Sequence, residues 1–244
     1  MPVTEFALLQ LSQPTPLTPH LRSTLASAMA VQDGWHAAAF PDLPSSARDR
    51  AAVWFAQVED PSQILTTARW PSVDAHWSWI RSAENRGVMA ALHDGDGHVV
   101  AAADTVLFHV EGDLFGDEKA SSSSSSSSRA GTGTGVVPLL ESAVVSVGRV
   151  FVARQEREAF AAKFEEVRGV LEAYASPNQV RFGWRQDGEE EGAAGEDEFV
   201  LVCGWESVEK HFGFAESRDF ARYGELRELI ARVDLKHYKR LSLE

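Results

Sequence analysis

The sequence predicts an α+β protein built from two tandem ferredoxin-like halves, each with the element order β-α-β-β-α-β. A run of eight serines at residues 121–128 divides the chain near its middle. On either side of this run one block recurs, because residues 70–82 align without gaps to residues 205–217 at a constant offset of 135. Trp, Ser, Val, His and a second Ser are identical in the two blocks, which indicates an internal repeat.

The apolar pattern of the first half predicts its elements in chain order. Strands are expected at residues 6–11, 52–58, 64–69 and 99–110, and the first helix at residues 19–29. The second helix is expected to follow Trp70. Ser72 is a natural N-cap for it, because a serine hydroxyl accepts a backbone N–H of the first helical turn.

The second half repeats this order. Strands are expected at residues 143–152, 180–185, 199–204 and 235–241, and a long helix at residues 155–174. In that helix Phe160, Phe164, Val167 and Leu171 follow one another at spacings of four, three and four, which forms an apolar stripe. Ser207 is the N-cap counterpart of Ser72, and the acidic, Gly-rich residues 187–197 are expected to form a solvated loop.

Each predicted sheet carries both helices on one face and leaves the other face bare. A covalent repeat supplies the missing partner, so we expect the two halves to pack sheet to sheet as a pseudo-dimeric α/β barrel. The expected domains are residues 1–116 and 138–244, joined by a disordered Ser/Gly-rich linker at residues 117–137. A monomer follows from this arrangement, because the chain contains its own pseudo-dimer.

Composition excludes several functional classes. The formal net charge of −13 argues against nucleic acid and anionic membranes as partners. The one cysteine, Cys203, excludes an intramolecular disulfide and a Cys-rich metal site. The histidines show no metal-ligand spacing, and no nucleotide-binding glycine motif follows a strand, so neither a metal nor a cofactor is predicted. The N-terminal residues lack a signal-peptide pattern, which favours a cytoplasmic location.

The repeated block resembles the dimeric α/β-barrel superfamily and, within it, the antibiotic-biosynthesis-monooxygenase-like (ABM) domains. The residues that carry the resemblance are Trp205, Ser207, His211, Phe214, Ser217 and Phe220, with Trp70, Ser72, His76, Trp79 and Ser82 in the first half, where Asn85 stands in place of the last Phe. This resemblance implies the paired ferredoxin-like fold. It is weak for the reaction, because the superfamily includes monooxygenases, decarboxylases, cyclases and haem-degrading enzymes. The axial His of the haem-degrading members has no match at residues 88–90 or 223–225, which disfavours haem.

The resemblance implies a cofactor-free, monooxygenase-like enzyme that acts on an aromatic or polyketide-type small molecule in secondary metabolism. His76 or His211 would be the general base, because a neutral imidazole is the usual proton carrier near neutral pH. Trp70 or Trp205 would donate its indole N–H to the substrate oxyanion. We expect His211 and Trp205 to be the working pair, since the second half keeps the fuller motif.

Two alternatives stay open. The same residue in both copies is also what a shared packing role predicts, so the histidines and tryptophans can be core residues of a non-catalytic small-ligand-binding or stress-response barrel. Residues present in only one half would mark an asymmetric site instead. These are Trp35, His36, Trp54, Asp104 and His109 in the first half, and Arg181, Trp184, His237 and Tyr238 in the second.

Overall fold

The structure, a computed structural model, describes residues 1–14, 16–93, 106–116, 135–187 and 195–243. The chain forms two compact units. Unit 1 consists of Met1–Asp113 and the C-terminal segment Tyr238–Glu244, and unit 2 consists of Leu114–His237. Most of the predicted linker and of the acidic loop, residues 117–134 and 188–194, lies outside the described residues, so the predicted domain boundaries stay a prediction.

Unit 1 has the predicted order of elements. They are β1 (Val3–Gln10), α1 (Pro19–Ala39), β2 (Val53–Gln57), β3 (Gln63–Trp70), α2 (Val73–Ile80), α3 (Ala83–His93) and β4 (Val106–Glu111). The strands lie in the order β4-β1-β3-β2, and β1 pairs antiparallel with both β3 and β4. This is the strand order of a ferredoxin-like sheet. Residues 238–240 of the C-terminal segment add to the edge at β2.

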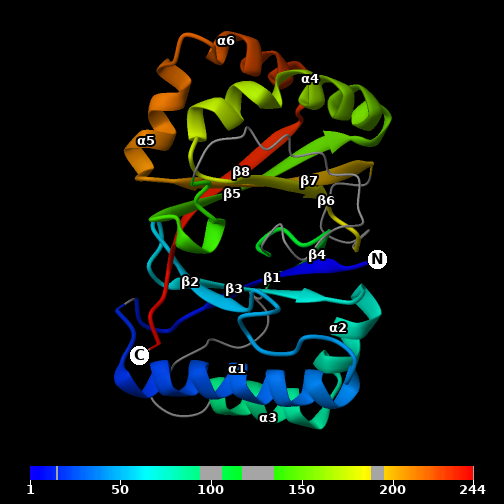
Figure 1. The fold of residues 1–244 in the computed structure, drawn as a ribbon, viewed down its shortest axis with the longest axis vertical. Helices are drawn as coiled ribbons and strands as arrows, with labels where there is room; N and C mark the ends of the chain where they lie inside the picture. The colour runs from blue at the N-terminus through cyan, green and yellow to red at the C-terminus, as the bar shows by residue number, and fades with distance from the viewer. Residues whose placement is uncertain (15, 94–105, 117–134, 188–194, 244) are drawn as a thin grey trace. The chain divides into compact units, whose positions relative to one another are not determined.

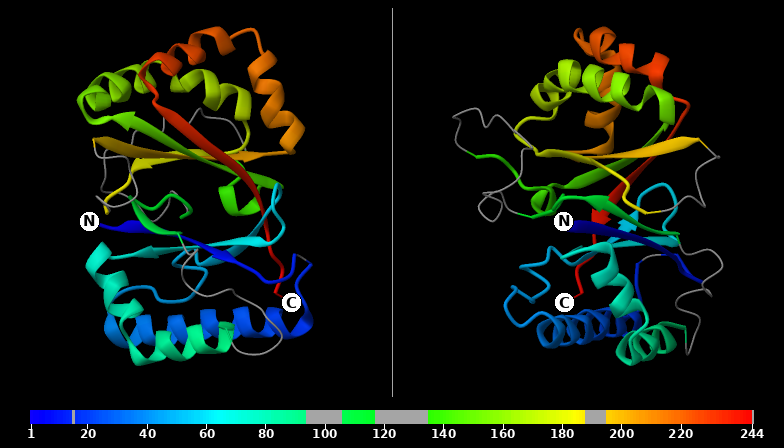
Figure 2. Two further views of the ribbon diagram at one scale, coloured as in Figure 1. Left: turned by 180° about the vertical axis from the view of Figure 1, so that it is seen from behind. Right: turned by 90° about the vertical axis from the view of Figure 1, so that its right-hand side faces the viewer.

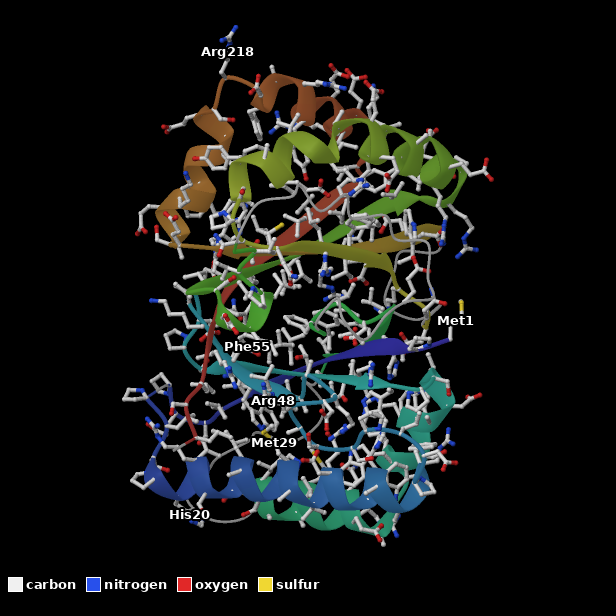
Figure 3. All side chains as sticks on the ribbon, viewed as in Figure 1. Met1, His20, Met29, Arg48, Phe55 and Arg218 are labelled. Carbon is white, nitrogen blue, oxygen red and sulfur yellow. The ribbon has the colours of Figure 1, made fainter. Side chains whose placement is uncertain are left out.

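The helices of unit 1 cover one face of its sheet. Figure 1 shows α1 and α3 side by side under the sheet, and Figure 2 shows the same layer from two other directions. Leu21 and Leu25 of α1 pack there against Leu9 and Ile64 of the strands. Met29 of α1, labelled in Figure 3, adds to the same cluster. Strand side chains alternate in direction, so Phe6, Phe55, Leu65 and Phe108 belong to the opposite face, where they are also buried.

Unit 2 repeats the arrangement. Its elements are β5 (Val144–Ala153), α4 (Arg157–Ala175), β6 (Val180–Trp184), β7 (Glu196–Trp205), α5 (Val208–Phe212), α6 (Phe220–Tyr223) and β8 (Arg232–Arg240), of which residues 238–240 are assigned to unit 1. The strand order β8-β5-β7-β6 is equivalent to that of unit 1. The predicted apolar stripe of α4 is buried. Its residues Phe160, Phe164 and Val167 pack in one cluster with Phe199 of β7, and Leu171 packs in another with Trp205. Figure 1 shows α4 and α6 on one face of this sheet.

Most predicted elements are found within a few residues of their expected ends, and the helices differ most. The helix α1 continues ten residues past its predicted end at Met29, to Ala39. Its last part has no continuous apolar stripe, but the buried side chain of His36 ties it to the rest of the unit. The second helix of each half is interrupted. In unit 1 it divides into α2 and α3, and in unit 2 into α5, α6 and the 3₁₀ turns Gly213–Glu216 and Gly224–Leu229.

Candidate functional site

The centre of the candidate site is Trp70, the last residue of β3. Its indole is fully buried between the sheet and α2. Ser72 caps α2 as predicted, because its hydroxyl accepts the backbone N–H of Ala75 at 3.1 Å. This cap starts the helix two residues after the strand, so that His76 lies over the indole. The two rings are stacked, with centroids 4.6 Å apart and planes 22° apart.

His76 forms a buried pair with His109 of β4. Nδ1 of His76 lies 2.6 Å from Nε2 of His109, and both side chains are fully buried. The rings meet edge to face, with centroids 4.8 Å apart. A bond between two ring nitrogens needs one proton, so one imidazole donates and the other accepts.

Glu5 brings a carboxyl group to this pair. It lies on β1, opposite His109 in the strand register, and is only 4% exposed. Its Oε2 accepts the indole N–H of Trp70 at 2.6 Å. The same oxygen lies 3.3 Å from Nε2 of His76. The alignment of these two atoms falls short of hydrogen-bond geometry, so Nε2 of His76 has no hydrogen-bond partner among the described residues.

Burial shifts the pKa values of Glu5 and His76 in opposite directions. Removal from water raises the pKa of Glu5 to about 7, against the smaller opposing effects of the Trp70 hydrogen bond and of His109 and Arg50. Burial also holds the pKa of His76 well below its usual range, and the nearby His109 and Arg50 act in the same direction. A proton bound between Glu5 and His76 is therefore expected on the carboxyl group of Glu5 rather than on the imidazole of His76.

Arg50 is the cation of this region and is 1% exposed. Its Nη2 donates to Asp33 at 2.5 Å and to Gln32 at 2.9 Å, and its Nε donates to the carbonyl of Ser45 at 3.2 Å. The guanidinium carbon lies 5.4 Å from the ring centroid of Trp70. Its Nη1 is buried and has no hydrogen-bond partner among the described residues. A group that accepts hydrogen bonds would therefore complete the site.

Trp35 and His36 of α1 line the same tryptophan. Their rings lie 6.3 and 5.7 Å from that of Trp70. Nδ1 of His36 is 2.8 Å from the hydroxyl of Ser45. Burial, followed by the charge of Arg50, lowers the pKa of His36 to about 4, so this imidazole is neutral at physiological pH.

Unit 2 contains a second copy of the cluster. His211 stacks on Trp205 with centroids 4.4 Å apart and planes 10° apart, and its Nδ1 lies 2.7 Å from Nε2 of His237. Ser207 caps the short helix α5 as predicted. The indole N–H of Trp205 donates to the hydroxyl of Ser146 at 2.8 Å.

Ser146 therefore takes the place that Glu5 has in unit 1. The strand register supports this equivalence, because Val3 is opposite Trp70 and Val144 is opposite Trp205, and Glu5 and Ser146 each follow two residues later. His211 is only partly buried, and its neighbour Phe212 is 60% exposed.

The structure thus places the four predicted site residues in two equivalent clusters, His76 with Trp70 and His211 with Trp205. The sequence analysis assigned His109 and His237 each to one half without a counterpart in the other. The structure corrects this, because each pairs with the stacked histidine of its own unit, so the two are counterparts. Their offset is 128 rather than 135, so an ungapped alignment separates them. Both indole N–H groups are already used within the clusters, by Glu5 and Ser146, so a substrate oxygen would have to displace that acceptor.

Glu5 and Arg50 were not predicted as site residues. The only signal for Glu5 is an acid at a position of β1 that points to the core, and such a signal needs the strand register to be seen. The other residues that the sequence analysis found in only one half lie in different places. Trp35 and His36 lie at the site, Trp54 and Trp184 belong to the hydrophobic cores, and Asp104 lies outside the described residues.

Two further features bear on cofactors and membranes. Within the described ranges no group of three or more His, Cys, Asp or Glu side chains has the arrangement to hold a metal ion. None of the helices seen in the described part of the chain has the length and apolar character needed to cross a bilayer.

The chain is similar over nearly its whole length to several solved structures. One is an anthrone oxidase-like protein, with 12% identity and a TM-score of 0.58 over 99% of this chain and 92% of that chain. Another is a putative monooxygenase from Fusobacterium nucleatum, with 8% identity and a TM-score of 0.57 over 99% and 93%. A mutant chlorite dismutase from Candidatus Nitrospira defluvii matches with 8% identity and a TM-score of 0.51 over 99% and 92%.

No family model matches the sequence, and no curated protein matches it either. The structural likeness shows the fold. The chain has the α+β fold of these structures, with two ferredoxin-like units, and this is the fold that its resemblance to ABM domains implied.

Proposed function

We propose that the protein is a monooxygenase-like enzyme that works without a bound cofactor on an enolisable aromatic or polyketide-type molecule, as a monomer. Its first chemical step is the removal of a proton from the substrate, and unit 1 contains the reacting groups. The observation that carries this proposal is the convergence on Trp70 of a buried carboxyl–imidazole pair and a buried guanidinium with an unused N–H.

The Glu5–His76 pair supplies the base. General-base catalysis is most effective when the pKa of the base lies near the working pH. The pKa of Glu5 is raised to about 7 by burial, which meets this condition. The carboxyl group then takes the proton that the substrate loses, and the contact between Nδ1 of His76 and Nε2 of His109, 2.6 Å long, holds His76 beside it.

Arg50 supplies the positive charge for the enolate. Removal of a proton next to a carbonyl or phenol places negative charge on oxygen, and a fixed cation in a buried site stabilises that charge strongly. Nη1 of Arg50 is the donor that has no other partner among the described residues. The rings of Trp35, Trp70 and Trp79 pack against one another beside this guanidinium, so the surroundings of the cation are aromatic.

The resulting carbanion is electron-rich and can give an electron to dioxygen, which is the oxidant in this proposal. Overall, a methylene carbon of the substrate loses two hydrogens and gains one oxygen atom, and the second oxygen atom leaves as water. The anthrone oxidase-like neighbour supports this substrate class by its fold alone. The sequence pattern favoured His211 and Trp205, but the proposal prefers His76 and Trp70, because Trp70 donates to the carboxylate of Glu5 where Trp205 donates to the hydroxyl of Ser146.

A non-catalytic ligand-binding barrel is the second candidate. It is favoured by the close agreement of the two clusters, with His–His distances of 2.6 and 2.7 Å, since a packing requirement would preserve the same geometry in both units. On this alternative the two histidine pairs hold the end of the second helix against the sheet and take no part in chemistry.

Kinetics with an anthrone-type substrate under air distinguishes the two functions. The proposal expects His76→Asn and Glu5→Gln to lose roughly a hundred- to ten-thousand-fold in kcat, which is the usual contribution of a general base. His211→Asn is the matched control and is expected to keep its turnover. If both His variants melt at lower temperature and keep turnover, the clusters are packing elements and the catalytic proposal is wrong.

A further inference from the structure

We infer that His36 selects the ligand of this site, in that its imidazole accepts a hydrogen bond from a hydroxyl group of the ligand while Arg50 donates to the ligand's carbonyl oxygen. The ligand class is therefore a neutral aromatic ketone that carries a free hydroxyl group. This inference rests on the proposed function and deepens it, because Arg50 is the group that the proposal assigns to the substrate oxygen. It follows from the single hydrogen that the hydroxyl of Ser45 can donate.

Ser45 fixes which nitrogen of His36 carries the proton. Its hydroxyl has one hydrogen and donates it to the carbonyl of Leu43 at 3.0 Å. Nδ1 of His36 lies 2.8 Å from the same hydroxyl oxygen, so Nδ1 must be the donor of that bond. Nε2 of a neutral His36 then has a lone pair, and it makes no hydrogen bond to a described residue. The imidazole is thus a fixed acceptor.

His36 is neutral near physiological pH. Burial, followed by the charge of Arg50, lowers its pKa to about 4. The lone pair of Nε2 is therefore present at neutral pH. With so low a pKa the imidazole accepts a hydrogen bond without taking the proton, which distinguishes its role from that of Glu5.

Arg50 is held beside this acceptor. The carbonyl of Ser45 accepts from Nε of Arg50 at 3.2 Å, so one residue binds both side chains. The guanidinium carbon lies 5.4 Å and the ring of His36 lies 5.7 Å from the ring centroid of Trp70. Nη1 of Arg50 has no hydrogen-bond partner among the described residues. A donor and an acceptor without partners therefore lie next to one indole ring.

The charge of the site favours a neutral ligand. Nη2 of Arg50 already donates to Asp33 at 2.5 Å, which balances much of the guanidinium charge. An anionic ligand would also bring its negative charge toward the lone pair of His36, which repels it. A carbonyl oxygen and a neutral hydroxyl group satisfy both open positions. This combination fits the ketone whose enolate Arg50 stabilises in the proposed reaction.

The site encloses its ligand, since the side chains of His36 and Arg50 are only 2% and 1% exposed. They contact α1, β3 and the segment 40–52, which joins α1 to β2. Of these, only the segment 40–52 lies outside the helices and strands. This segment, which includes Ser45, is therefore the part of unit 1 that moves to admit a ligand.

The test compares two ligands that differ in whether their hydroxyl group can donate. In 1-hydroxyanthraquinone the hydroxyl is bonded to the adjacent carbonyl of the same molecule, whereas in 2-hydroxyanthraquinone it is free. Both quinones are already oxidised, so binding is measured without turnover, by quenching of tryptophan fluorescence at a pH where both phenols are protonated. We expect the 2-hydroxy isomer to bind about three- to tenfold more tightly, the usual contribution of one hydrogen bond.

NMR of ¹⁵N-labelled histidine checks the cause of this preference. In the ligand-free chain His36 should carry its proton on Nδ1, and 2-hydroxyanthraquinone should shift the Nε2 resonance while Nδ1 stays protonated. Equal binding of the two isomers, binding of neither, or a proton on Nε2 in the free chain would overturn the inference. Tighter binding of anthraquinone-2-carboxylate than of the 2-hydroxy isomer would also overturn it, because that result indicates an anion site at Arg50.

Ser45→Ala tests the residue that fixes the tautomer. The variant loses the hydroxyl and keeps the carbonyl that binds Arg50. His36 should then populate the form with its proton on Nε2, and the preference for the 2-hydroxy isomer should fall. Ser46→Ala is the matched control, because the Ser46 hydroxyl bonds to Asp49, and it should keep both the tautomer and the preference. Loss of the preference in both serine variants would contradict the account.

His36→Phe keeps a flat ring and removes both nitrogens. We expect it to bind the two isomers equally. A loosened fold would weaken the binding of both isomers alike, so the ratio of the two affinities reports the hydrogen bond itself. A folded His36→Phe chain that retains the preference contradicts the inference.

The binding site and the enzymatic proposal can fail separately. An isomer preference that depends on His36, in a chain that oxidises no anthrone, would leave the binding site standing and remove the function. Oxidation of an anthrone at equal rates by the wild type and His36→Phe, with no isomer preference in either, would remove the role of His36 and leave the function.

Discussion

Glu5 on β1 and Ser146 on β5 occupy the same place in two copies of one cluster, and each accepts the indole N–H of the tryptophan that ends the third strand of its unit. The frame around them is conserved within the chain, since a histidine pair stacks on the tryptophan in both units. At this position the two units differ by one ionisable group, a carboxyl in unit 1 and a hydroxyl in unit 2. Comparing the same substitution in the two units therefore distinguishes the effect of the Glu5 charge from that of the tryptophan–histidine packing, which both units have.

Replacing Glu5 with Gln should make the stability of the protein less sensitive to an increase in pH. Because the pKa of Glu5 is 4.5 in the unfolded chain and about 7 in the folded one, the folded state binds the proton more tightly. The stability contributed by Glu5 is full below 4.5 and is lost as the pH rises through 7. Between pH 5 and 8 this loss amounts to about 2 to 3 kcal/mol in the wild type and is absent in the variant. Urea unfolding of both proteins at these two pH values measures it.

Other groups act in the opposite direction, so the comparison must be made between variant and wild type. The pKa of His36 falls from 6.5 to about 4 on folding, and that of His76 is also lowered. Their contribution is full above 6.5 and is lost as the pH falls through the folded values. These effects are present in both proteins and cancel in the difference. A difference in unfolding free energy that does not change from pH 5 to pH 8 would show that Glu5 is not buried as a shifted acid.

Trp70→Phe should cost more stability at pH 8 than Trp205→Phe. Both replacements remove an indole N–H, but in unit 1 the lost partner is a buried carboxylate and in unit 2 it is a neutral hydroxyl. Hydrogen bonds to charged groups contribute about 1.5 to 3 kcal/mol, against about 1 kcal/mol for neutral ones. We expect the excess cost of Trp70→Phe to shrink at pH 5, where Glu5 is protonated. Equal costs for the two variants at both pH values would contradict this account.

The sequence was sufficient for the fold because the repeat carries its own signals. Ser72 and Ser207 cap the second helices as expected, and the stripe from Phe160 to Leu171 is buried as expected. These features depend on neighbours within one or two helical turns. The extension of α1 to Ala39 depends instead on the burial of His36, which is a tertiary contact that periodicity does not report.

The sequence predicted the part of the candidate site that is local in the chain, and it missed the part that depends on tertiary contacts. His76 and Trp70 lie six residues apart, so the block that contains them reveals the stack. Glu5, Arg50 and His109 reach the stack from β1, from the segment before β2 and from β4. Only the strand register brings them together, and a single sequence does not determine register across that separation.

Ser72→Ala should destabilise unit 1 by about 1 kcal/mol, since its hydroxyl caps α2. The helix it caps carries His76, so the variant is also expected to broaden the NMR signals of the His76–His109 pair. Ser78→Ala on the same helix is the matched control, because Ser78 is exposed and bonds only to the carbonyl of Asp74. Its unfolding free energy should stay within about 0.5 kcal/mol of the wild type. Equal losses for the two alanine variants would mean that the cap does not position the histidine.

Arg50→Met should be the most damaging of these replacements. It leaves Asp33 without the cation that now lies 2.5 Å away, and because the Asp33 side chain is 26% exposed we expect the cost of a lost hydrogen bond to a charged group, about 1.5 to 3 kcal/mol, in addition to the lost bonds to Gln32 and Ser45. The double variant Arg50→Met with Asp33→Asn removes the stranded charge and is expected to regain part of that loss. Because Arg50 lowers the pKa of His36 and Asp33 raises it by less, the single variant should show a higher His36 pKa in an NMR titration, and the double variant a smaller rise. If the single variant is as stable as the wild type and the pKa of His36 does not move, Arg50 is not the buried cation of this site.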